Sequence, residues 1–371
     1  MRIVHTDTDD LGNPLRGGQP VRTFEINSRL SPRHDITVFT ATYPGCVRRE
    51  TKAGVTYRRV GTGTERLGLS YHLSFLASLP VAIRNTPHDL VVEEFTPPVG
   101  FCLSPWWSGK PVVSIVQWFF FGDWERKYHL PFSRIMKALP KVSRYRNFIV
   151  QTDRMGNYFR ELIPQASIWK IPCGIGDAAF SNTPNDGDYA LFLGRLDIHH
   201  KGLDLLLDAW TKLRESGLRI PLKIVGAGQG EAWLRERIEA AGLQEFVELP
   251  GRLENGDKLE MLRGCRFLVM PSRQETFGIT ALEAMAAARP VIAFDIDHLN
   301  ELVCGEAGIL VRSGDVEALS REVAALWQDR DRAAHLGARA YQHARGFRWD
   351  EIAGLQEQVY SDVVNRQRRH S

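Results

Sequence analysis

Two glutamates, eight residues apart, lie where the sequence carries its strongest chemical signal. Glu275 and Glu283 belong to the segment PSRQETFGITALEAMA, residues 271–286, which follows an apolar run and continues with apolar residues at helical spacing. We therefore expect Glu275 in a loop after a strand and Glu283 one turn inside the next helix. A carboxylate among apolar residues is costly to bury without polar partners, so Glu283 indicates a ligand contact. A half-exposed helical glutamate is the simpler alternative.

The start of that helix and a second loop offer contacts of another kind. Free backbone amides and the positive end of the helix dipole, near Gly278, suit a phosphate. The loop GRLDIHHKG, residues 194–202, carries Arg195 and Lys201 between a predicted strand and a predicted helix. A guanidinium and an ammonium on one loop can clamp a diphosphate, whereas two surface cations beside a turn are the alternative.

Two glycine-rich turns could bring backbone amides to a ligand. Gly17 and Gly18 precede the first predicted helix, and GAGQG at residues 226–230 follows a strand. Each could equally be an ordinary tight turn. The second turn also lacks the acidic residue, about 20 positions further on, that a redox dinucleotide site requires.

Other charged residues carry weaker signals. Asp7 with Asp9, and Asp295 with Asp297, resemble a metal-binding DxD pattern, but ordinary loop acids are the simpler interpretation, and we predict no metal site.

The five cysteines lie far apart, which predicts neither a disulfide framework nor a zinc site. Five Lys and Arg beside apolar residues in 132–146 fit either a peripheral contact with an anionic membrane or a solvated face.

The elements that must position these residues alternate between short apolar strands and amphipathic helices. In the first half we predict strands at 2–6, 36–40, 55–60, 90–93, 112–117, 147–151 and 167–171, and helices at 18–30, 69–83, 132–142 and 153–162. After a Gly-, Pro- and Asn-rich segment at 172–188, strands are predicted at 189–194, 222–225, 246–249, 267–270, 291–294 and 308–311. Helices are predicted there at 203–216, 231–241, 256–262, 279–288 and 316–327.

This alternation predicts two α/β domains with doubly wound parallel sheets, joined by one hinge. We place them at residues 1–175 and 176–348, with a helix from 349 to about 365 and a frayed tail, together 349–371, that crosses back to the first domain. Ligands of open α/β sheets bind outside the carboxyl ends of the strands, so we expect the chemistry in a shared cleft.

Composition narrows the class of protein. A length of 371 residues suits two domains, and 43% apolar with 25% charged residues excludes a disordered or fibrous chain. The net charge of +3 is too small to indicate nucleic acid as a partner. Neither a signal peptide nor a membrane-spanning run is visible in the sequence, so we expect a cytoplasmic protein.

The motifs together resemble glycosyltransferase family 4, the retaining nucleotide-sugar transferases of the GT-B fold. The resemblance covers nearly the full chain and rests on Gly17-Gly18, Gly194-Arg195-Leu196, Lys201-Gly202, the 226–228 turn, Glu275-x7-Glu283 and Phe347-x-Trp349. It implies two Rossmann-like domains facing across a cleft, the first binding the acceptor and the second the nucleotide sugar.

The resemblance also implies roles for single residues. Arg195 and Lys201 would hold the donor diphosphate, Glu283 the ribose hydroxyls, and Glu275 the transferred sugar, so that Arg195, Lys201 and Glu275 form the catalytic group. The remaining donor-side positions are Gly18, Gln117, Gly226, Arg252, Phe277, Gly278 and Ile279, and the acceptor-side positions are Gly17, Asp9 and Glu93. Glu93 could instead stabilise the sheet edge.

Two departures from the family pattern stand out. The family often has a histidine after the strand at 112–116, where this chain has Gln117, which can form hydrogen bonds but cannot titrate. The Gly-Gly turn common after the strand at 291–294 is replaced by Asp295-Ile-Asp-His, although Glu301 matches.

The sequence thus predicts a metal-independent retaining transferase that moves a hexose-type sugar from a UDP- or GDP-linked donor to an acceptor hydroxyl. The acceptor would be a glycan, a glycolipid or a small glycoside, and no other cofactor is expected. A nucleotide-sugar epimerase and a non-catalytic nucleotide-sugar-binding subunit are the alternatives. Gln117 counts against the first, and the intact charged set around Glu275 and Glu283 counts against the second.

Overall fold

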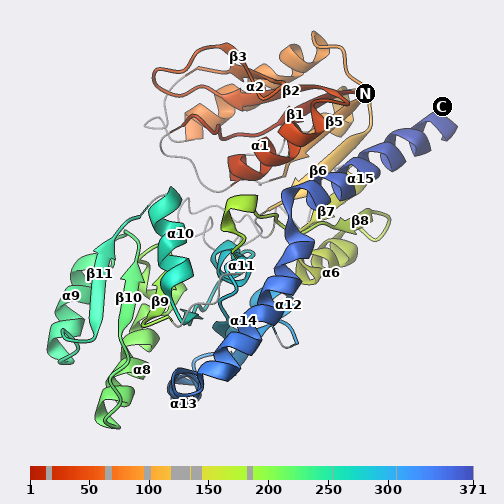
Figure 1. The fold of residues 1–371 in the computed structure, drawn as a ribbon. Helices are drawn as coiled ribbons and strands as arrows, with labels where there is room; N and C mark the ends of the chain where they lie inside the picture. The colour runs from red at the N-terminus through yellow and green to blue at the C-terminus, as the bar shows by residue number, and fades with distance from the viewer. Residues whose placement is uncertain are drawn as a thin grey trace. The chain divides into compact units, whose positions relative to one another are not determined.

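A computed structural model describes residues 1–13, 19–62, 69–95, 102–117, 134, 144–181, 187–253, 255–305 and 307–370. The chain forms two compact α/β units (Figure 1). Unit 1 comprises Met1–Gly174 and Trp349–Ser371, and unit 2 comprises Ile175–Arg348.

Unit 1 is built on an eight-stranded sheet in the order β3-β4-β2-β1-β5-β6-β7-β8. Its strands are β1 (Arg2–Thr6), β2 (Asp35–Ala41), β3 (Arg49–Lys52), β4 (Val55–Val60), β5 (Leu90–Glu94), β6 (Val112–Val116), β7 (Asn147–Val150) and β8 (Ser167–Lys170). All pairings are parallel except that of β3 with β4, a short polar edge hairpin that the apolar pattern did not predict. Strands β5 and β6 are buried at every position, including Glu93 and Glu94 at the end of β5 and Ser114 in β6, so these polar side chains need partners inside the unit.

The helices of unit 1 are α1 (Gln19–Leu30), α2 (Leu69–Arg84), α3 (Ser104–Trp107), α6 (Asp153–Leu162) and α15 (Trp349–His370). The predicted return of the C-terminal helix to the first domain is confirmed, because α15 packs against α1 (Figure 1). Charged contacts tie the two helices: Arg29 reaches Asp350 at 2.6 Å.

The expected frayed tail is wrong, since α15 continues to His370. The helix predicted at 132–142 lies outside the described residues apart from Arg134.

Unit 2 is built on a six-stranded parallel sheet in the order β11-β10-β9-β12-β13-β14. Its strands are β9 (Ala190–Leu193), β10 (Leu222–Val225), β11 (Val247–Gly251), β12 (Phe267–Met270), β13 (Val291–Asp295) and β14 (Gly308–Arg312). Its helices are α7 (Ile198–Lys201), α8 (Leu203–Glu215), α9 (Glu231–Ala240), α10 (Asn255–Gly264), α11 (Ile279–Ala286), α12 (Leu299–Leu302), α13 (Val316–Gln328) and α14 (Arg330–Ala344). A hydrophobic core joins alternate residues of the strands, among them Phe192, Phe267 and Phe294, to helices α8 and α13, and it includes the buried Trp210.

Helix α14 is a fifteen-residue helix that the sequence pattern did not predict. Its buried face consists of small residues, among them Ala333, Gly337, Ala340 and Ala344, rather than the large apolar residues that mark most amphipathic helices. A Cβ added at Gly337 would lie 2.3 Å from the carbonyl oxygen of Ala288, so the small residues allow α14 to approach α11 closely.

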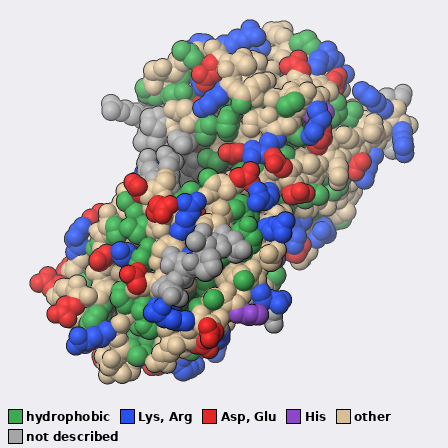
Figure 2. All heavy atoms as spheres, in the orientation of Figure 1, with side chains coloured by type: hydrophobic (Ala, Val, Ile, Leu, Met, Phe, Trp, Pro, Cys, Tyr) green, Lys and Arg blue, Asp and Glu red, His purple; other side chains and the backbone are tan. Residues whose placement is uncertain are grey.

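Both sheets reverse their strand order at one point. In unit 1 the order reverses between β1 and β5, and in unit 2 between β9 and β12. In doubly wound sheets, ligands bind outside the carboxyl ends of the strands at this point. Asp7, Arg195 and Glu275 lie in the loops after β1, β9 and β12, and Glu94 is the last residue of β5. Over the face drawn in Figure 2, acidic and basic side chains are interspersed, as the small net charge implies.

Candidate functional site

A pocket of about 390 Å³ opens at the carboxyl ends of β9 and β10 in unit 2. Four predicted residues line it: Arg195, Gly226, Arg252 and Glu283. The other lining residues are Leu193, Gly194, Val225, Ala227, Leu253, Lys258 and Thr280. The pocket therefore joins the loop after β9, the glycine turn after β10, the loop before α10 and the first turns of α11.

Lys201 and Glu275, 74 residues apart in the chain, meet beside these loops. The Lys201 ammonium donates to Glu275 Oε1 at 2.6 Å, and the Ser272 hydroxyl donates to the same oxygen at 2.9 Å. Among the described residues nothing is bonded to Glu275 Oε2, so this oxygen remains for a ligand. Glu275 lies in the loop before α11, as predicted.

Arg273 fixes the two loops relative to each other. Its guanidinium donates to both carboxylate oxygens of Asp204, at 2.8 and 2.7 Å, and to the carbonyl oxygen of His199 at 3.0 Å. The backbone amide of Arg273 also donates to the carbonyl oxygen of His200. Lys201 therefore reaches Glu275 from the end of α7, which the contacts of Arg273 with His199 and His200 hold beside the loop after β12.

Gly202 ends α7 and begins α8 in the left-handed conformation, with φ of 63°. A Cβ at this position would lie 1.9 Å from the carbonyl oxygen of Pro271, in the loop that leads to Glu275. Only glycine permits both the conformation and the approach.

Replacing Gly202 with alanine is expected to lower the free energy of unfolding by about 2–4 kcal/mol, since left-handed strain and a backbone clash add. Gly217, with φ of 81° and open space around it, is the matched control, and Gly217→Ala should cost only about 1–2 kcal/mol. Urea unfolding of both variants measures the difference. Equal losses would show that the approach to Pro271 is not tight.

Glu283 lies inside α11 as predicted, but it has a partner that sequence reasoning missed. The Lys258 ammonium of α10 donates to Glu283 Oε1. Lys258 also lines the pocket. Among the described residues nothing is bonded to Glu283 Oε2, so one carboxylate oxygen remains for a ligand. Lys258 is one of 47 Lys and Arg and follows no recognisable motif, so only its neighbourhood identifies it.

The turn that begins α11 carries three predicted donor-side residues, Phe277, Gly278 and Ile279. Gly278 precedes the helix with φ of 89°. Phe277 is only 7% exposed and its ring packs near that of Phe347, 6.3 Å between centroids, so its side chain belongs to the core of unit 2. Ile279 is 41% exposed. Thr280, in the first turn, lines the pocket.

Gly226 and Arg252 border the pocket on the β10 and β11 side. A Cβ at Gly226 would lie 1.8 Å from the carbonyl oxygen of Gly194, which explains the glycine after β10. Arg252 is exposed and follows β11 directly. Both residues therefore belong to the lining of the same pocket, as Arg195 and Glu283 do.

In unit 1 a chain of buried polar side chains lies at the carboxyl ends of β1, β5 and β6. Asp7 accepts hydrogen bonds from Thr23 at 2.6 Å and from the amide of Gln19 at 2.7 Å. Glu94 accepts from the Gln117 amide at 2.7 Å. Gln117 thus follows β6 at the predicted position, with its amide nitrogen directed at a carboxylate.

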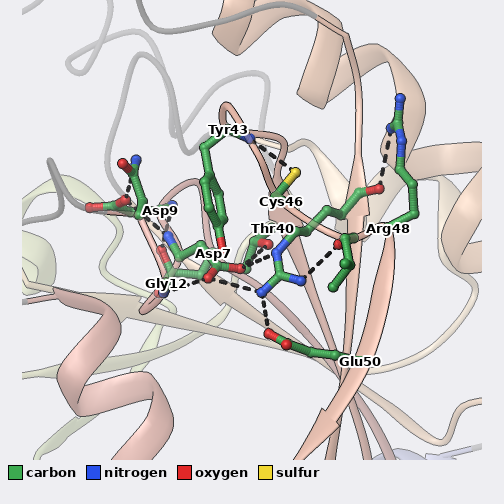
Figure 3. A network of polar contacts seen from close by, with 12 residues as sticks. Asp7, Asp9, Gly12, Thr40, Tyr43, Cys46, Arg48 and Glu50 are labelled. Atoms are coloured by element: carbon green, nitrogen blue, oxygen red, sulfur yellow. Dashed lines mark hydrogen bonds and ion pairs between the residues drawn. The ribbon is translucent and has the colours of Figure 1, made fainter.

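The loop after β1 is held by a buried ion pair (Figure 3). Arg59 contacts Asp10 through Nε at 2.9 Å, and the labelled Thr40 and Glu50 flank the pair, Thr40 donating to Asp10 and Glu50 accepting from Arg59. Asp9, labelled in the same loop, accepts from the backbone amide of Asp10. The predicted acceptor-side residue Asp9 therefore lies in a loop that Asp10 ties to β2 and β4 through Thr40 and Arg59.

The other acceptor-side positions have different outcomes. Gly17 lies outside the described residues, and so does Gly18, which was predicted on the donor side. Glu93 is fully buried and accepts from the Tyr145 hydroxyl at 2.6 Å, from the Ser104 hydroxyl and from the backbone amide of Cys102. Both of its oxygens are used, so the geometry favours the alternative in which Glu93 stabilises the sheet edge.

Burial raises the pKa of Asp7 well above its ordinary value, and the nearby Glu94 carboxylate raises it further. The unfolded chain therefore releases this proton at a lower pH than the folded protein does. Between these two values stability falls as pH rises.

Asp7→Asn should remove this pH dependence, so the stability of the variant relative to the native protein is expected to increase from pH 4 to pH 8. Urea unfolding at several pH values measures the difference. Asp9→Asn, in the same loop but half-exposed, is the control and should show no such trend. A constant offset for Asp7→Asn would contradict a raised pKa.

Within the described ranges, no three His, Cys, Asp or Glu side chains gather as a metal site would require. None of the helices in the described part of the chain combines the length and apolar character needed to cross a membrane.

Two family models and several known proteins match this chain. The family model described as Glycosyl transferases group 1 matches residues 177–343, and the model described as Glycosyltransferase Family 4 matches residues 16–178. A phosphatidyl-myo-inositol mannosyltransferase of Mycobacterium leprae is 34% identical over 206 residues, 53% of this chain and 54% of that protein. A D-inositol 3-phosphate glycosyltransferase of Streptomyces scabiei is 31% identical over 50% of this chain and 44% of that protein. The matches thus span about half the length of these relatives.

Solved structures resemble the chain over its full length. Sucrose-phosphate synthase from Thermosynechococcus elongatus superposes with a TM-score of 0.81 at 21% identity, covering 98% of this chain and 99% of that one. HepE from Anabaena in complex with UDP-glucose superposes with a TM-score of 0.74 at 17% identity, covering 98% and 100%. At these identities the likeness shows the fold, which is GT-B. Since the two family models together account for residues 16 to 343, the chain belongs to glycosyltransferase family 4.

Proposed function

We propose that this glycosyltransferase moves a hexose-type sugar from a nucleotide diphosphate donor to an acceptor hydroxyl with retention of anomeric configuration. The observation that carries the proposal is the pocket of unit 2, which joins Arg195, Glu283 and Lys258 to the glycine turn at Gly226. HepE, of the same fold, is named as a complex with UDP-glucose.

Different residues of the pocket and of the loops beside it bind the ribose, the base and the diphosphate of the proposed donor. Glu283 Oε2 accepts from the ribose hydroxyls, and Lys258 keeps the carboxylate oriented through Oε1. The base lies between the turn at Gly226 and the guanidinium of Arg252. Arg195 and Lys201 hold the diphosphate, with backbone amides near Gly278 and Ile279 beside it.

Catalysis is mainly electrostatic. Negative charge develops on the departing diphosphate, and Arg195, Lys201 and the start of α11 stabilise it from fixed positions. Glu275 meets the transferred sugar through Oε2 while Lys201 holds Oε1. The acceptor hydroxyl attacks on the face that the diphosphate leaves, and the leaving phosphate takes the proton.

The acceptor side is proposed for unit 1, near Asp9. Two relatives are named for transfer to phosphatidyl-myo-inositol and to inositol phosphate, so a polyol or a lipid-linked polyol is the proposed acceptor. A lipid-linked acceptor would bring the protein into peripheral contact with a membrane.

A panel of nucleotide sugars tests the proposal. UDP-glucose, UDP-N-acetylglucosamine, GDP-mannose and ADP-glucose are each added to the protein, and the shift in melting temperature and the release of nucleoside diphosphate are measured. We expect one UDP- or GDP-sugar to raise the melting temperature and to be cleaved to a product with the donor's anomeric configuration. Inversion at the anomeric carbon, epimerisation of the bound sugar, or binding without cleavage in the presence of inositol acceptors would each contradict the proposal.

EDTA is expected to leave the activity unchanged, because the cationic groups around Lys201 supply the charge that a metal ion provides in other transferases. The initial rate with the selected donor is measured before and after exhaustive chelation. Loss of activity that magnesium or manganese restores would show that a metal ion takes part.

A further inference from the structure

Helix α2 of unit 1 is apolar on its outer side as well as on its inner side. The inner side packs into the core through Phe75 and Leu79, both buried. On the outer side Leu73 is 55% exposed and Val81 is 65% exposed, and Ala77, four residues from each, is exposed between them. A helix that is apolar all round is normally covered on every side, so the outer stripe indicates a partner.

The outer stripe of α2 lacks the charged residues that ordinarily keep a helix face in water. The sequence of α2 contains no Asp, Glu or Lys, and its one arginine, Arg84, stands in the last turn. Apart from this terminal arginine, α2 thus carries no residue of the kinds that a solvated helix face ordinarily shows.

Arginines of neighbouring segments flank α2 near both of its ends. Arg48 is exposed and donates to the carbonyl oxygen of Gly61 at 3.0 Å. Gly61 in turn lies against the first half of α2, because a Cβ at this position would lie 2.9 Å from the backbone nitrogen of Phe75. Arg58 donates to the hydroxyl of Thr86, just past the end of α2, at 2.8 Å.

The β3–β4 hairpin adds a fourth arginine to the same side of the sheet. Arg49 of β3 lies directly opposite Arg58 of β4. Side chains opposite each other in an antiparallel pair share a face, and the guanidinium of Arg58 lies 5.1 Å from the ring centroid of Phe39, in the core that α2 covers. Two like charges in this arrangement destabilise a hairpin, and an anionic partner would remove that penalty.

A further exposed aromatic residue lies on this face of the sheet. Trp107 of α3 packs against the same core as Phe75, so α2 and α3 cover one face. The neighbouring Trp106 is 51% exposed, and the guanidinium of Arg144 lies 4.7 Å from the centroid of its ring. Tryptophan is enriched at the boundary between water and lipid, where its ring is apolar and its N–H remains hydrated.

We propose that this face of unit 1 docks on the surface of an anionic phospholipid bilayer. Leu73, Ala77 and Val81 enter the boundary between headgroups and acyl chains, and the arginines around them contact lipid phosphates. A second copy of this chain fits less well, because a symmetric pair would bring the same arginines against one another. The inference is independent of the proposed function, since docking requires neither donor nor acceptor.

Co-sedimentation with vesicles tests the proposal. The full chain is mixed with vesicles of phosphatidylcholine alone, or of phosphatidylcholine with about a third phosphatidylglycerol, and the partition coefficient is measured at several salt concentrations. We expect the anionic vesicles to bind the native protein about tenfold more strongly or better, and this binding should weaken as salt rises.

Two double variants separate the apolar from the charged contribution. Leu73→Gln with Val81→Gln should weaken binding to anionic vesicles about tenfold or more, because two apolar side chains no longer enter the bilayer boundary. Arg49→Gln with Arg84→Gln should weaken it by a similar factor and also flatten its salt dependence. Trp106→Ala should weaken it about threefold.

Matched substitutions elsewhere on the surface serve as controls. Leu355→Gln with Trp233→Gln replaces two exposed apolar residues on α15 and α9. Arg235→Gln with Arg237→Gln removes two charges from α9, where they pair with Glu231 and Asp208. Both control variants should bind within about twofold of the native protein.

Absence of vesicle binding, equal binding to both kinds of vesicle, or native binding by the Leu73/Val81 and Arg49/Arg84 double variants would each overturn the proposal. The transferase function would be untouched, because no nucleotide sugar is present. Sedimentation velocity without vesicles is measured alongside. A native dimer that the Leu73/Val81 variant dissociates would assign the surface to a second copy and overturn the membrane assignment. If melting shows that this variant does not fold, the Arg49/Arg84 variant decides.

Discussion

Replacing Lys201 with alanine is expected to lower kcat/KM by about 10²–10³-fold, or about 2–4 kcal/mol of transition-state stabilisation, while the fold is retained. Lys201 is the cation that the structure brings to Glu275, at 2.6 Å. Its removal takes positive charge from the place where the diphosphate departs and leaves Glu275 with Ser272 as its hydrogen-bond partner. Arg195→Ala should have an effect of similar size. Initial rates at several donor concentrations measure both.

Lys212 provides the matched control for this prediction. It is a lysine of the same unit that pairs with a glutamate, Glu317, at 2.5 Å on an exposed surface. Lys212→Ala should leave the rate unchanged, because surface ion pairs contribute little. A Lys201 variant as active as the Lys212 variant would remove Lys201 from the diphosphate site.

The two glutamates of the Glu-x7-Glu pattern should separate binding from turnover. Glu283→Gln is expected to weaken the affinity for nucleoside diphosphate about tenfold, because Lys258 loses its charged partner and the ribose loses a charged acceptor. Glu275→Gln should leave that affinity within about twofold and lower kcat with the full donor about 100-fold, because the proposed function assigns Glu275 to the sugar and not to the nucleotide. Calorimetry with the diphosphate and initial rates with the donor measure the two effects.

Glu317→Gln, on the exposed face of α13, is the control for both substitutions. Equal loss of diphosphate affinity in the Glu275 and Glu283 variants would show that both carboxylates serve the nucleotide. Loss of affinity in Glu275→Gln alone would reverse the assignment.

Those features of the fold that rest on large apolar residues could be predicted from the sequence. Strands such as β12 and helices such as α6 have the predicted bounds, because unbroken apolar runs and amphipathic spacing reflect burial directly. The edge strand β3 and helix α14 could not be predicted in this way. Strand β3 is polar, and helix α14 buries alanine and glycine against α11. Neither sequence therefore shows large apolar residues at the regular spacing that marks a strand or a helix.

The residues of the candidate site likewise divide into those that the sequence predicts and those that it does not. Glu275, Glu283, Arg195 and Lys201 stand in motifs whose spacing around a strand and a helix is fixed, and they could be found from the sequence. Lys258 could not, because its contact with Glu283 depends on how α10 packs beside α11. The orientation of Gln117 depends in the same way on a carboxylate 23 residues earlier in the chain.

Hydrogen exchange with and without bound nucleoside diphosphate tests most directly the claim that the pocket of unit 2 holds the donor. Backbone amides are compared by mass spectrometry for the full chain alone and with saturating UDP or GDP, whichever binds. We expect protection of the segments that line the pocket, at residues 193–195, 225–227, 252–258 and 280–283, and loss of that protection in Glu283→Gln at the same diphosphate concentration. Protection confined to segments of unit 1, or unchanged by Glu283→Gln, would contradict the account.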